Sequence, residues 1–204
     1  MRTKFITFEG SEGCGKSTQS RLLYEYLKQK GFKVLYLREP GGTKISEKIR
    51  QLLLDAKNES MSRECELLLY MASRAQLVHE IIKPALKEGK IVICDRFLDS
   101  TLAYQGFGLG MDLDLIKYIG EFATLGVKPD LTILMDLPVE DGLKYRHLIE
   151  DRIEKRSLNY HTRVRKGYLA LARLYPKRVK IVKVDEDKSV TQGNVRKFVL
   201  QIIK

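Results

Sequence analysis

The sequence predicts an α/β fold in which a parallel, five-stranded sheet carries helices on both faces. Two observations predict it: short apolar segments recur along the chain, and amphipathic helical patterns lie between them. Strands that alternate with helices pair in parallel, because each crossover helix returns the chain to the same end of the sheet. The length of 204 residues fits one domain that covers residues 1–204.

The predicted strands are apolar runs that are too short for helices and that mostly lack a polar face. They cover residues 5–8, 34–37, 91–94, 131–135 and 179–184. In an open parallel sheet, ligands bind beyond the carboxyl ends of the strands. We therefore expect the functional residues directly after positions 8, 37, 94 and 135.

Apolar residues at helical spacing predict amphipathic helices between the strands. Three stripes carry this pattern: Leu22, Leu23, Tyr26 and Leu27; Leu68, Met71, Ala72, Ala75, Val78 and Ile82; and Val195, Phe198, Val199, Ile202 and Ile203. Burial of such stripes removes apolar surface from water, so each of them is expected to pack against a neighbouring element.

The composition excludes several classes of protein. With 44% hydrophobic and 31% charged residues, the chain is neither disordered nor collagen-like. No apolar run is long enough to span a membrane, and the N-terminal residues lack a signal-peptide pattern, so we expect a soluble, cytoplasmic protein with no membrane partner. Three widely separated cysteines, Cys14, Cys65 and Cys94, predict reduced thiols and no zinc site.

The formal net charge of +11 is concentrated in one part of the chain. Residues 142–180 contain twelve Lys or Arg and three acidic residues, a net charge of +9. Such a segment suits a nucleic acid, an anionic surface or a polyphosphate substrate, and it also occurs as an ordinary solvated helix face. The choice among these four interpretations depends on which anion-binding motif occurs in the rest of the chain.

The loop after the first strand matches G-x-x-x-x-G-K-[ST], the phosphate-binding P-loop, between a strand and an amphipathic helix. Glycines are needed because successive backbone N–H groups must converge on phosphate oxygens at a helix N-terminus. Lys16 would bridge the β- and γ-phosphates of ATP, and the Ser17 hydroxyl would bind Mg²⁺. The ATP-binding residues are Gly10, Ser11, Glu12, Gly13, Cys14, Gly15, Lys16, Ser17 and Thr18.

Other motifs restrict the reaction. The D-x-x-G and N-K-x-D strings of GTP switches do not occur in the sequence, so a small kinase is favoured over a GTPase. Asp95 follows four apolar residues and has the form of a metal-assisting carboxylate. Asp136 has the same form, but we prefer Asp95, because Arg96 beside it can bind a second phosphate.

The chain resembles the thymidylate kinases, a family of P-loop nucleoside monophosphate kinases. The resemblance rests on FEG at 8–10 with the P-loop, REPGGT at 38–43, residues 70–76, DRFLDSTLAYQG at 95–106, and DRIE at 151–154 within a basic lid. It implies a three-layer P-loop NTPase fold with a lid at approximately 142–160, and transfer of the γ-phosphoryl group of Mg-ATP to dTMP, which gives dTDP in dTTP synthesis. It also implies a homodimer, which the stripe at residues 68–82 could form, although core packing explains that stripe equally well.

The resemblance further implies the substrate-binding residues Glu39, Arg50, Tyr70, Arg74, Arg96, Thr101, Tyr104 and Gln105. Thymine would stack on Tyr70 and be hydrogen-bonded by Arg74, which lies four residues later on the same helix face. Thr101 and Gln105 match further contacts to the base, and Tyr104 matches a ring that crowds the 2′ position of the sugar.

The remaining roles concern phosphate and sugar. Arg50 and Arg96 match a clamp on the acceptor phosphate, while Glu39 lies near the acceptor's sugar and phosphate. The catalytic residues implied by the resemblance are Lys16, Arg96, Arg152 and Glu12, and the metal-binding residues are Ser17 and Asp95. Arg152 matches a catalytic arginine of the lid best, with Arg146 and Arg156 nearby.

The acceptor explains why no histidine is required. A phosphate monoester has a second pKa near 6 and is mostly dianionic at pH 7, so it attacks without a general base. Alternative functions are a deoxynucleoside kinase, which would leave Arg50 and Arg96 without a purpose, or a kinase of another nucleoside monophosphate. A nucleic-acid binder is disfavoured, because the basic segment lacks the interleaved aromatic residues that stack on bases.

Overall fold

A computed structural model describes residues 3–144 and 151–203 of the chain. Five strands form one sheet in the order β2-β3-β1-β4-β5, and every neighbouring pair is parallel. The strands are β1 (Lys4–Glu9), β2 (Val34–Arg38), β3 (Ile91–Asp95), β4 (Leu131–Asp136) and β5 (Val179–Lys183). The predicted fold is confirmed. Four of the five strands continue one residue beyond the apolar run, so that a charged residue ends each of them.

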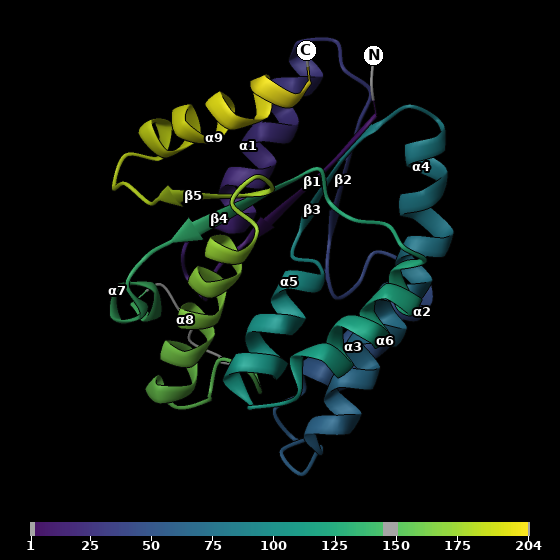
Figure 1. Ribbon diagram of the computed structural model, residues 1–204, viewed down its shortest axis with the longest axis vertical. Coiled ribbons are helices and arrows are strands. Elements are labelled where there is room, and N and C mark those ends of the chain that lie inside the picture. The colour runs from purple at the N-terminus through teal and green to yellow at the C-terminus, as the bar shows by residue number, and fades with distance from the viewer. Residues whose placement is uncertain (1–2, 145–150, 204) are drawn as a thin grey trace.

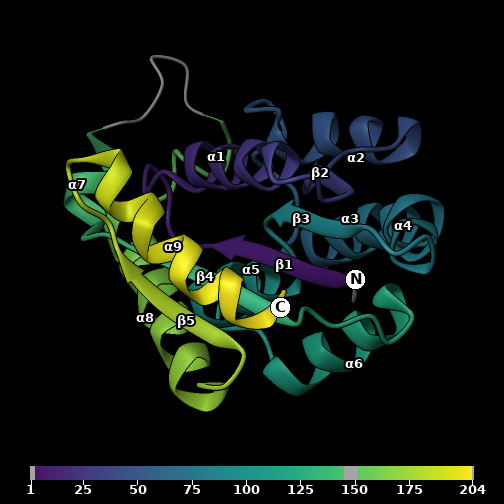
Figure 2. The same cartoon turned by 90° about the horizontal axis from the view of Figure 1, so that it is seen from above.

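Helices cover both faces of this sheet (Figures 1 and 2). One face packs against α1 (Lys16–Gln29) and α9 (Lys188–Ile202). The other face is covered by α3 (Arg63–Leu77), η1 (Val78–Ile82), α4 (Lys83–Lys87), α5 (Leu98–Thr101), η2 (Leu102–Gly108) and α8 (Leu158–Leu174). Outside them lie α2 (Lys44–Leu54) and α6 (Leu113–Thr124), and α7 (Val139–Leu143) follows β4. Of the helices in the described part of the chain, none has the length and apolar character to cross a membrane.

The alternation of side chains along β1 explains the two layers. Ile6 and Phe8 are fully buried against α1 and α9, while Phe5 packs on the opposite face beside Phe97. Successive side chains of a strand point to opposite faces, so a strand that is apolar throughout requires cover on both. Leu23 and Leu27 of the first predicted stripe are likewise fully buried.

The stripe predicted at residues 68–82 is buried only in part. Met71, Val78 and Ile82 belong to the core, but Leu68 is 56% exposed and Ala72 is also exposed. Core packing therefore does not explain these two residues, because α3 turns polar side chains inward: Glu66 and Arg74 are buried on it beside Leu67 and Leu77. The face of α3 that carries Leu68 is left on the surface.

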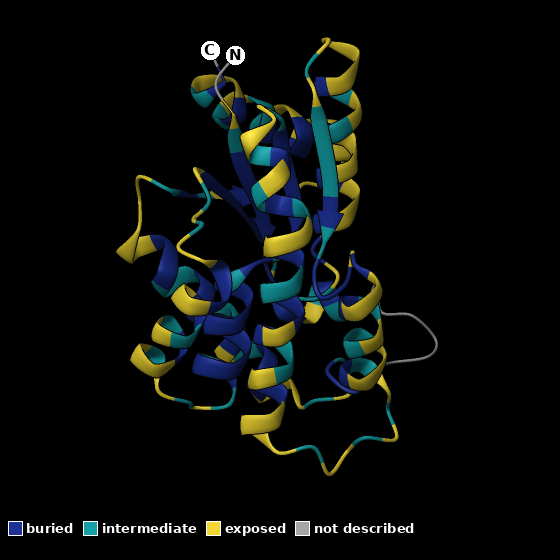
Figure 3. Ribbon diagram, turned by 90° about the vertical axis from the view of Figure 1, so that its right-hand side faces the viewer, coloured by how far each residue is buried: buried dark blue, intermediate teal, exposed yellow. Residues whose placement is uncertain are grey.

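Large apolar side chains are exposed on α2, α3 and α6, where α3 packs against each of the other two helices; Figure 3 colours the exposed residues of the ribbon yellow. We call this group the apolar helix surface; it consists of Ile45, Leu52, Leu68, Leu115, Tyr118 and Phe122. Tyr118 and Phe122 are 77% and 80% exposed. Contiguous exposed apolar patches are uncommon on monomeric proteins and mark surfaces that bind other proteins.

Candidate active site

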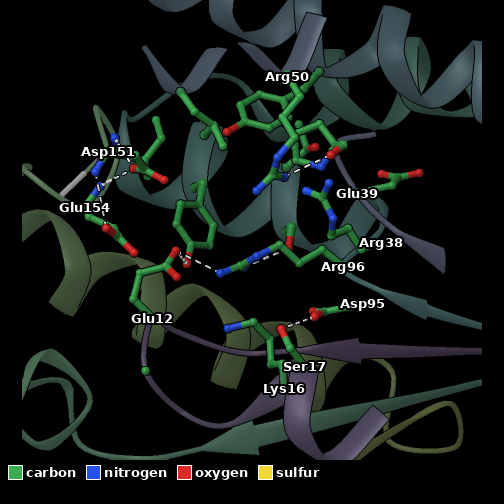
Figure 4. A pocket seen from close by; sticks show the side chains of 18 of the residues that line it. Glu12, Lys16, Ser17, Arg38, Glu39, Arg50, Asp95, Arg96, Asp151 and Glu154 are labelled. Carbon is green, nitrogen blue, oxygen red and sulfur yellow. Dashed lines mark hydrogen bonds and ion pairs between the residues drawn. The ribbon is translucent and has the colours of Figure 1, made fainter. Parts of the chain in front are cut away.

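A pocket of about 550 Å³ opens at the carboxyl ends of β1, β2 and β3 (Figure 4). Its walls come from the P-loop, the segment after β2, and the helices α2, α3 and η2. The predicted site residues that line it are Glu12, Gly13, Gly15, Lys16, Ser17, Thr18, Glu39, Arg50, Tyr70, Arg74, Asp95, Arg96, Thr101, Tyr104 and Gln105. Segments that are far apart in the sequence therefore form one cavity. It lies at the carboxyl ends of the strands, where the sequence predicts the functional residues.

The P-loop wraps around the Lys16 side chain. Its Nζ donates a hydrogen bond of 2.6 Å to the Ser11 carbonyl oxygen. Gly13 has φ +70°, and a Cβ atom there would lie 1.9 Å from the carbonyl oxygen of Gly142, so only glycine fits this turn. Because α1 begins at Lys16, the N–H groups of its first turn and the positive end of its dipole face the pocket.

Ser17 and Asp95 meet at the floor of the pocket, where the Ser17 hydroxyl donates a hydrogen bond to Asp95 Oδ2. Hard oxygen donors of this kind suit Mg²⁺, which keeps several waters and takes one or two protein ligands. Both oxygens of Asp136, by contrast, accept hydrogen bonds from Arg165, at 2.8 and 3.0 Å. The geometry thus favours Asp95 over Asp136 as the metal-assisting carboxylate.

Arg96 crosses the pocket and ends on the P-loop acid. Its Nη2 donates to Glu12 Oε1 at 2.8 Å, and the Tyr104 hydroxyl donates to the same oxygen at 2.7 Å. Burial alone would raise the pKa of Glu12, but the charges of Arg96 and Lys16 outweigh it and lower that pKa to about 2. Glu12 is therefore ionised at neutral pH and holds Arg96, whose guanidinium lies 5.0 Å from the centre of the Tyr104 ring.

A second acid, Glu9, shares two hydrogen-bond partners, Ser100 and Tyr168, with Arg96, and the sequence-based interpretation gave it no role. Glu9 accepts hydrogen bonds from the Phe97 backbone N–H at 2.7 Å, the Ser100 hydroxyl at 2.5 Å and the Tyr168 hydroxyl at 2.9 Å. Burial and then the nearby Asp99 raise the pKa of Glu9 to about 7. The available signal was an acid placed directly after a buried strand, at the position that the sheet topology reserves for functional groups.

A second part of the pocket wall is built around Arg74, whose side chain is 2% exposed. It donates to Glu39 Oε2 at 2.8 Å, to Thr101 Oγ1 at 2.9 Å and to the Phe97 carbonyl oxygen at 3.0 Å. Within the described part of the chain, the other oxygen of Glu39 is buried and has no hydrogen-bond partner. Such an oxygen in a pocket wall points to a ligand that supplies a donor.

Arg152 lies elsewhere than the sequence-based interpretation expects. Its guanidinium does not line the pocket; Nη1 pairs with Glu66 Oε2 at 2.6 Å, and Nε donates to the Leu53 carbonyl oxygen at 2.9 Å. Arg156 pairs with the same Glu66 oxygen at 2.6 Å. The third arginine of the predicted lid, Arg146, lies outside the described residues.

Several lining residues were not assigned a role from the sequence: Arg38, Pro40, Leu54, Ser100, Asp151, Ile153 and Glu154. All of them except Leu54 belong to the motif blocks at 38–43, 95–106 and 151–154, which was the only signal in the sequence. Among the predicted residues, Gly10, Ser11 and Cys14 shape the P-loop without lining the cavity. Burial raises the pKa of the Cys14 thiol, which keeps it protonated beside Lys16.

Comparisons with known proteins identify the family that this chain resembles. The family model described as "Thymidylate kinase" matches residues 8–195 of the chain. The chain is 57% identical over 178 residues to a thymidylate kinase of Geotalea daltonii, which covers 82% of this chain and 83% of that protein. It is 48% identical over 200 residues to a thymidylate kinase of Symbiobacterium thermophilum, which covers 98% and 94%.

A solved structure shows the same likeness in three dimensions. The crystal structure of thymidylate kinase from Ehrlichia chaffeensis superposes with a TM-score of 0.82 and is 36% identical in sequence. The match covers 98% of this chain and 100% of that one.

Proposed function

The chain belongs to the thymidylate kinase family, and from this premise we propose that its pocket transfers the γ-phosphoryl group of ATP to dTMP, which gives dTDP and ADP for dTTP synthesis. One observation carries the proposal: a single cavity joins the P-loop residues Lys16 and Ser17 to a wall with an aromatic ring and arginines. Comparisons with known proteins do not favour a deoxynucleoside kinase or a kinase of another monophosphate.

The donor end of the pocket is the P-loop. Lys16 and the first turn of α1 would bind the β- and γ-phosphates of ATP, and Ser17 with Asp95 would hold Mg²⁺. When bound, Mg²⁺ neutralises phosphate charge and aligns the phosphate oxygens. A reaction that consumes ATP also fits the cytoplasmic location that we expect from the sequence.

The acceptor end is formed by α3 and η2. Tyr70 offers a half-buried ring for the thymine to stack on, and Thr101 and Gln105 stand beside it. Arg74 presents a fixed guanidinium to the same space, and the unpartnered oxygen of Glu39 is placed to accept a hydrogen bond from the sugar. The π-helical turn of η2 brings consecutive residues, Tyr104 and Gln105, to one pocket.

Charge neutralisation is the main chemical task of this site. ATP and a monophosphate together bring about six negative charges into the pocket, and catalysis of phosphoryl transfer consists mostly of positioning and electrostatic stabilisation. Lys16, Arg50 and Arg96 line the cavity and would supply positive charge from three sides (Figure 4). Arg152 can join them only after release from Glu66, so its direct role stays a prediction.

A coupled ADP-release assay tests the function. With ATP and Mg²⁺, dTMP is expected to give a kcat/KM well above those of dUMP, dCMP, dGMP and thymidine, because the pocket offers both a base site and arginines for the acceptor phosphate. Omission of Mg²⁺ should abolish turnover. Phosphorylation of thymidine at a rate equal to that of dTMP would contradict the proposal, since thymidine has no phosphate for Arg50 and Arg96 to bind.

Replacement of Tyr104 by alanine tests the sugar contact. If the ring excludes a 2′-hydroxyl by its bulk, Tyr104→Ala should raise the efficiency with UMP relative to dUMP, although both rates fall with the loss of the hydrogen bond to Glu12. Tyr104→Phe is the matched control, because it removes that hydrogen bond and keeps the ring. A UMP-to-dUMP ratio that does not change in the alanine variant would show that Tyr104 does not select the sugar.

We also propose that two copies of the chain associate through the apolar helix surface. Six large apolar side chains on α2, α3 and α6 are exposed together, which is costly in water and favours a self-complementary contact. Sedimentation equilibrium should show a dimer, and Phe122→Glu should shift it to the monomer, whereas a monomeric wild-type protein would contradict the proposal.

A further inference from the structure

Glu66 is a fully buried acid on the helix that carries the base-site residues. It precedes Tyr70 by four residues and Arg74 by eight, a spacing that places all three on one face of α3. A carboxylate with no exposed surface needs partners that offset its desolvation. Tyr70 and Arg74 line the substrate pocket, whereas Glu66 lies outside its lining.

The two oxygens of Glu66 bind different parts of the chain. Oε1 accepts a hydrogen bond of 2.8 Å from Nε2 of Gln105, which lines the pocket. Oε2 accepts from Arg152 Nη1 and Arg156 Nη2, each at 2.6 Å. Glu66 thus joins η2 to residues 151–157, which we call the arginine turn.

The arginine turn is held in place by these contacts. The Arg152 backbone N–H donates to the Leu54 carbonyl oxygen at 3.2 Å, and its Nε donates to that of Leu53, so the turn also rests on the C-terminal end of α2. Arg156 lies 4.6 Å from the centre of the Tyr160 ring. Other residues of the same turn, at 151, 153 and 154, line the pocket, so the turn forms part of its wall.

A carboxylate at this point also fixes the amide of Gln105. An ionised carboxylate only accepts hydrogen bonds, so the nitrogen end of the amide must face it and the amide has a single orientation. A neutral amide in place of Glu66 could donate as well as accept, and Gln105 could then turn over. The same change would leave two guanidinium groups close together without a counter-charge.

We propose that Glu66 is a positioning residue that couples recognition of the acceptor base to the arginine turn. One carboxylate oxygen of Glu66 sets the amide orientation of Gln105, and the other oxygen sets the positions of Arg152 and Arg156. A displacement of either arginine is therefore expected to alter the orientation of the Gln105 amide. This inference rests on the proposed function, because it concerns the base of a nucleoside monophosphate bound in the pocket.

The test is the preference for dTMP over dCMP, measured as a ratio of kcat/KM values. Glu66→Gln should lower kcat/KM for dTMP by about tenfold or more, the scale of losing hydrogen bonds to a charged group, and should also lower the dTMP-to-dCMP ratio. Glu64→Gln is the matched control, because Glu64 lies on the same helix, is exposed and pairs with the exposed Arg63. Circular dichroism at the assay temperature confirms that each variant is folded.

A second variant separates coupling from a purely structural role and does not depend on the folding of Glu66→Gln. Arg156 does not line the pocket and its side chain is 20% exposed. Arg156→Gln is nevertheless expected to reduce the dTMP-to-dCMP ratio, while Lys155→Gln, the neighbouring cation, should keep it. A folded Arg156→Gln variant with the wild-type ratio overturns the inference.

A double substitution completes the test. If Glu66 acts on the base through Gln105, then Glu66→Gln combined with Gln105→Ala should lose no more selectivity than Gln105→Ala alone. Additive losses would show independent roles and would also overturn the inference. Failure of the wild-type protein to phosphorylate dTMP contradicts the proposed function itself, whereas an active wild type with unaltered variants contradicts only the coupling.

Discussion

Lys16→Ala is expected to lower kcat by about a hundredfold or more and to leave the fold intact. The Lys16 ammonium group is held in the P-loop by the Ser11 carbonyl oxygen and lies where phosphate charge would develop during transfer. Removing one preorganised charge of this kind costs a few kcal/mol of barrier, at about 1.4 kcal/mol for each tenfold in rate. Steady-state kinetics with ATP and dTMP measure the effect.

The interpretation of this variant depends on two controls. Lys28→Ala removes an exposed cation from the last turn of the same helix and should keep normal kinetics. The thermal unfolding midpoint of Lys16→Ala should stay close to that of the wild type, because in the described part of the chain the Lys16 ammonium group bonds to Ser11 and Cys14 of its own loop. A near-normal kcat in Lys16→Ala would show that the P-loop lysine takes no part in the reaction.

Arg96→Ala is expected to damage both kcat and the KM for dTMP. Its guanidinium joins Glu12, Tyr104 and the carbonyl oxygen of Gly10 in the middle of the pocket, between the donor and acceptor ends. An arginine that binds the acceptor phosphate and also stabilises the transferring group contributes to the ground state and to the transition state. We expect a loss of at least about a hundredfold in kcat/KM.

Two other arginines separate these contributions. Arg63→Ala, which changes an exposed arginine at the start of α3, should have no effect. An arginine that acts only on the transferring phosphoryl group should lower kcat and leave the KM for dTMP nearly unchanged, which is the predicted behaviour of Arg152→Ala. An Arg96→Ala variant that changes kcat alone would place Arg96 with the donor phosphates and leave the acceptor clamp to Arg50.

The sheet and the P-loop were predictable because their signals are local. Each strand is a contiguous apolar run, and the sequence of residues 10–18 itself carries the glycines that the loop requires. Asp95 could be preferred over Asp136 only from its neighbour Arg96. The structure supplies the stronger reason, since Asp136 is engaged by Arg165 while Asp95 meets Ser17.

The buried acids could not be predicted in the same way. Glu66 is separated by 39 residues from Gln105 and by 90 residues from Arg156, and no local pattern announces such pairings. The place of Arg152 follows from the same network, because a guanidinium beside a buried carboxylate pairs with it. The exposure of Leu68 on α3 is related to the same network. The charged side chains of Glu66 and Arg74 occupy part of the inward face of this helix, which leaves less of that face for apolar side chains.

The enclosure of Arg74 has a consequence for binding entropy. A free arginine that becomes ordered by a ligand loses rotamer freedom at a cost of about 0.5 to 1.5 kcal/mol. Glu39, Thr101 and the Phe97 carbonyl oxygen already restrict Arg74, whose guanidinium also lies 5.4 Å from the centre of the Phe97 ring. Arg74 therefore loses this rotamer entropy when the chain folds and not when a ligand binds. A base bound against Arg74 is expected to have a correspondingly more favourable binding free energy.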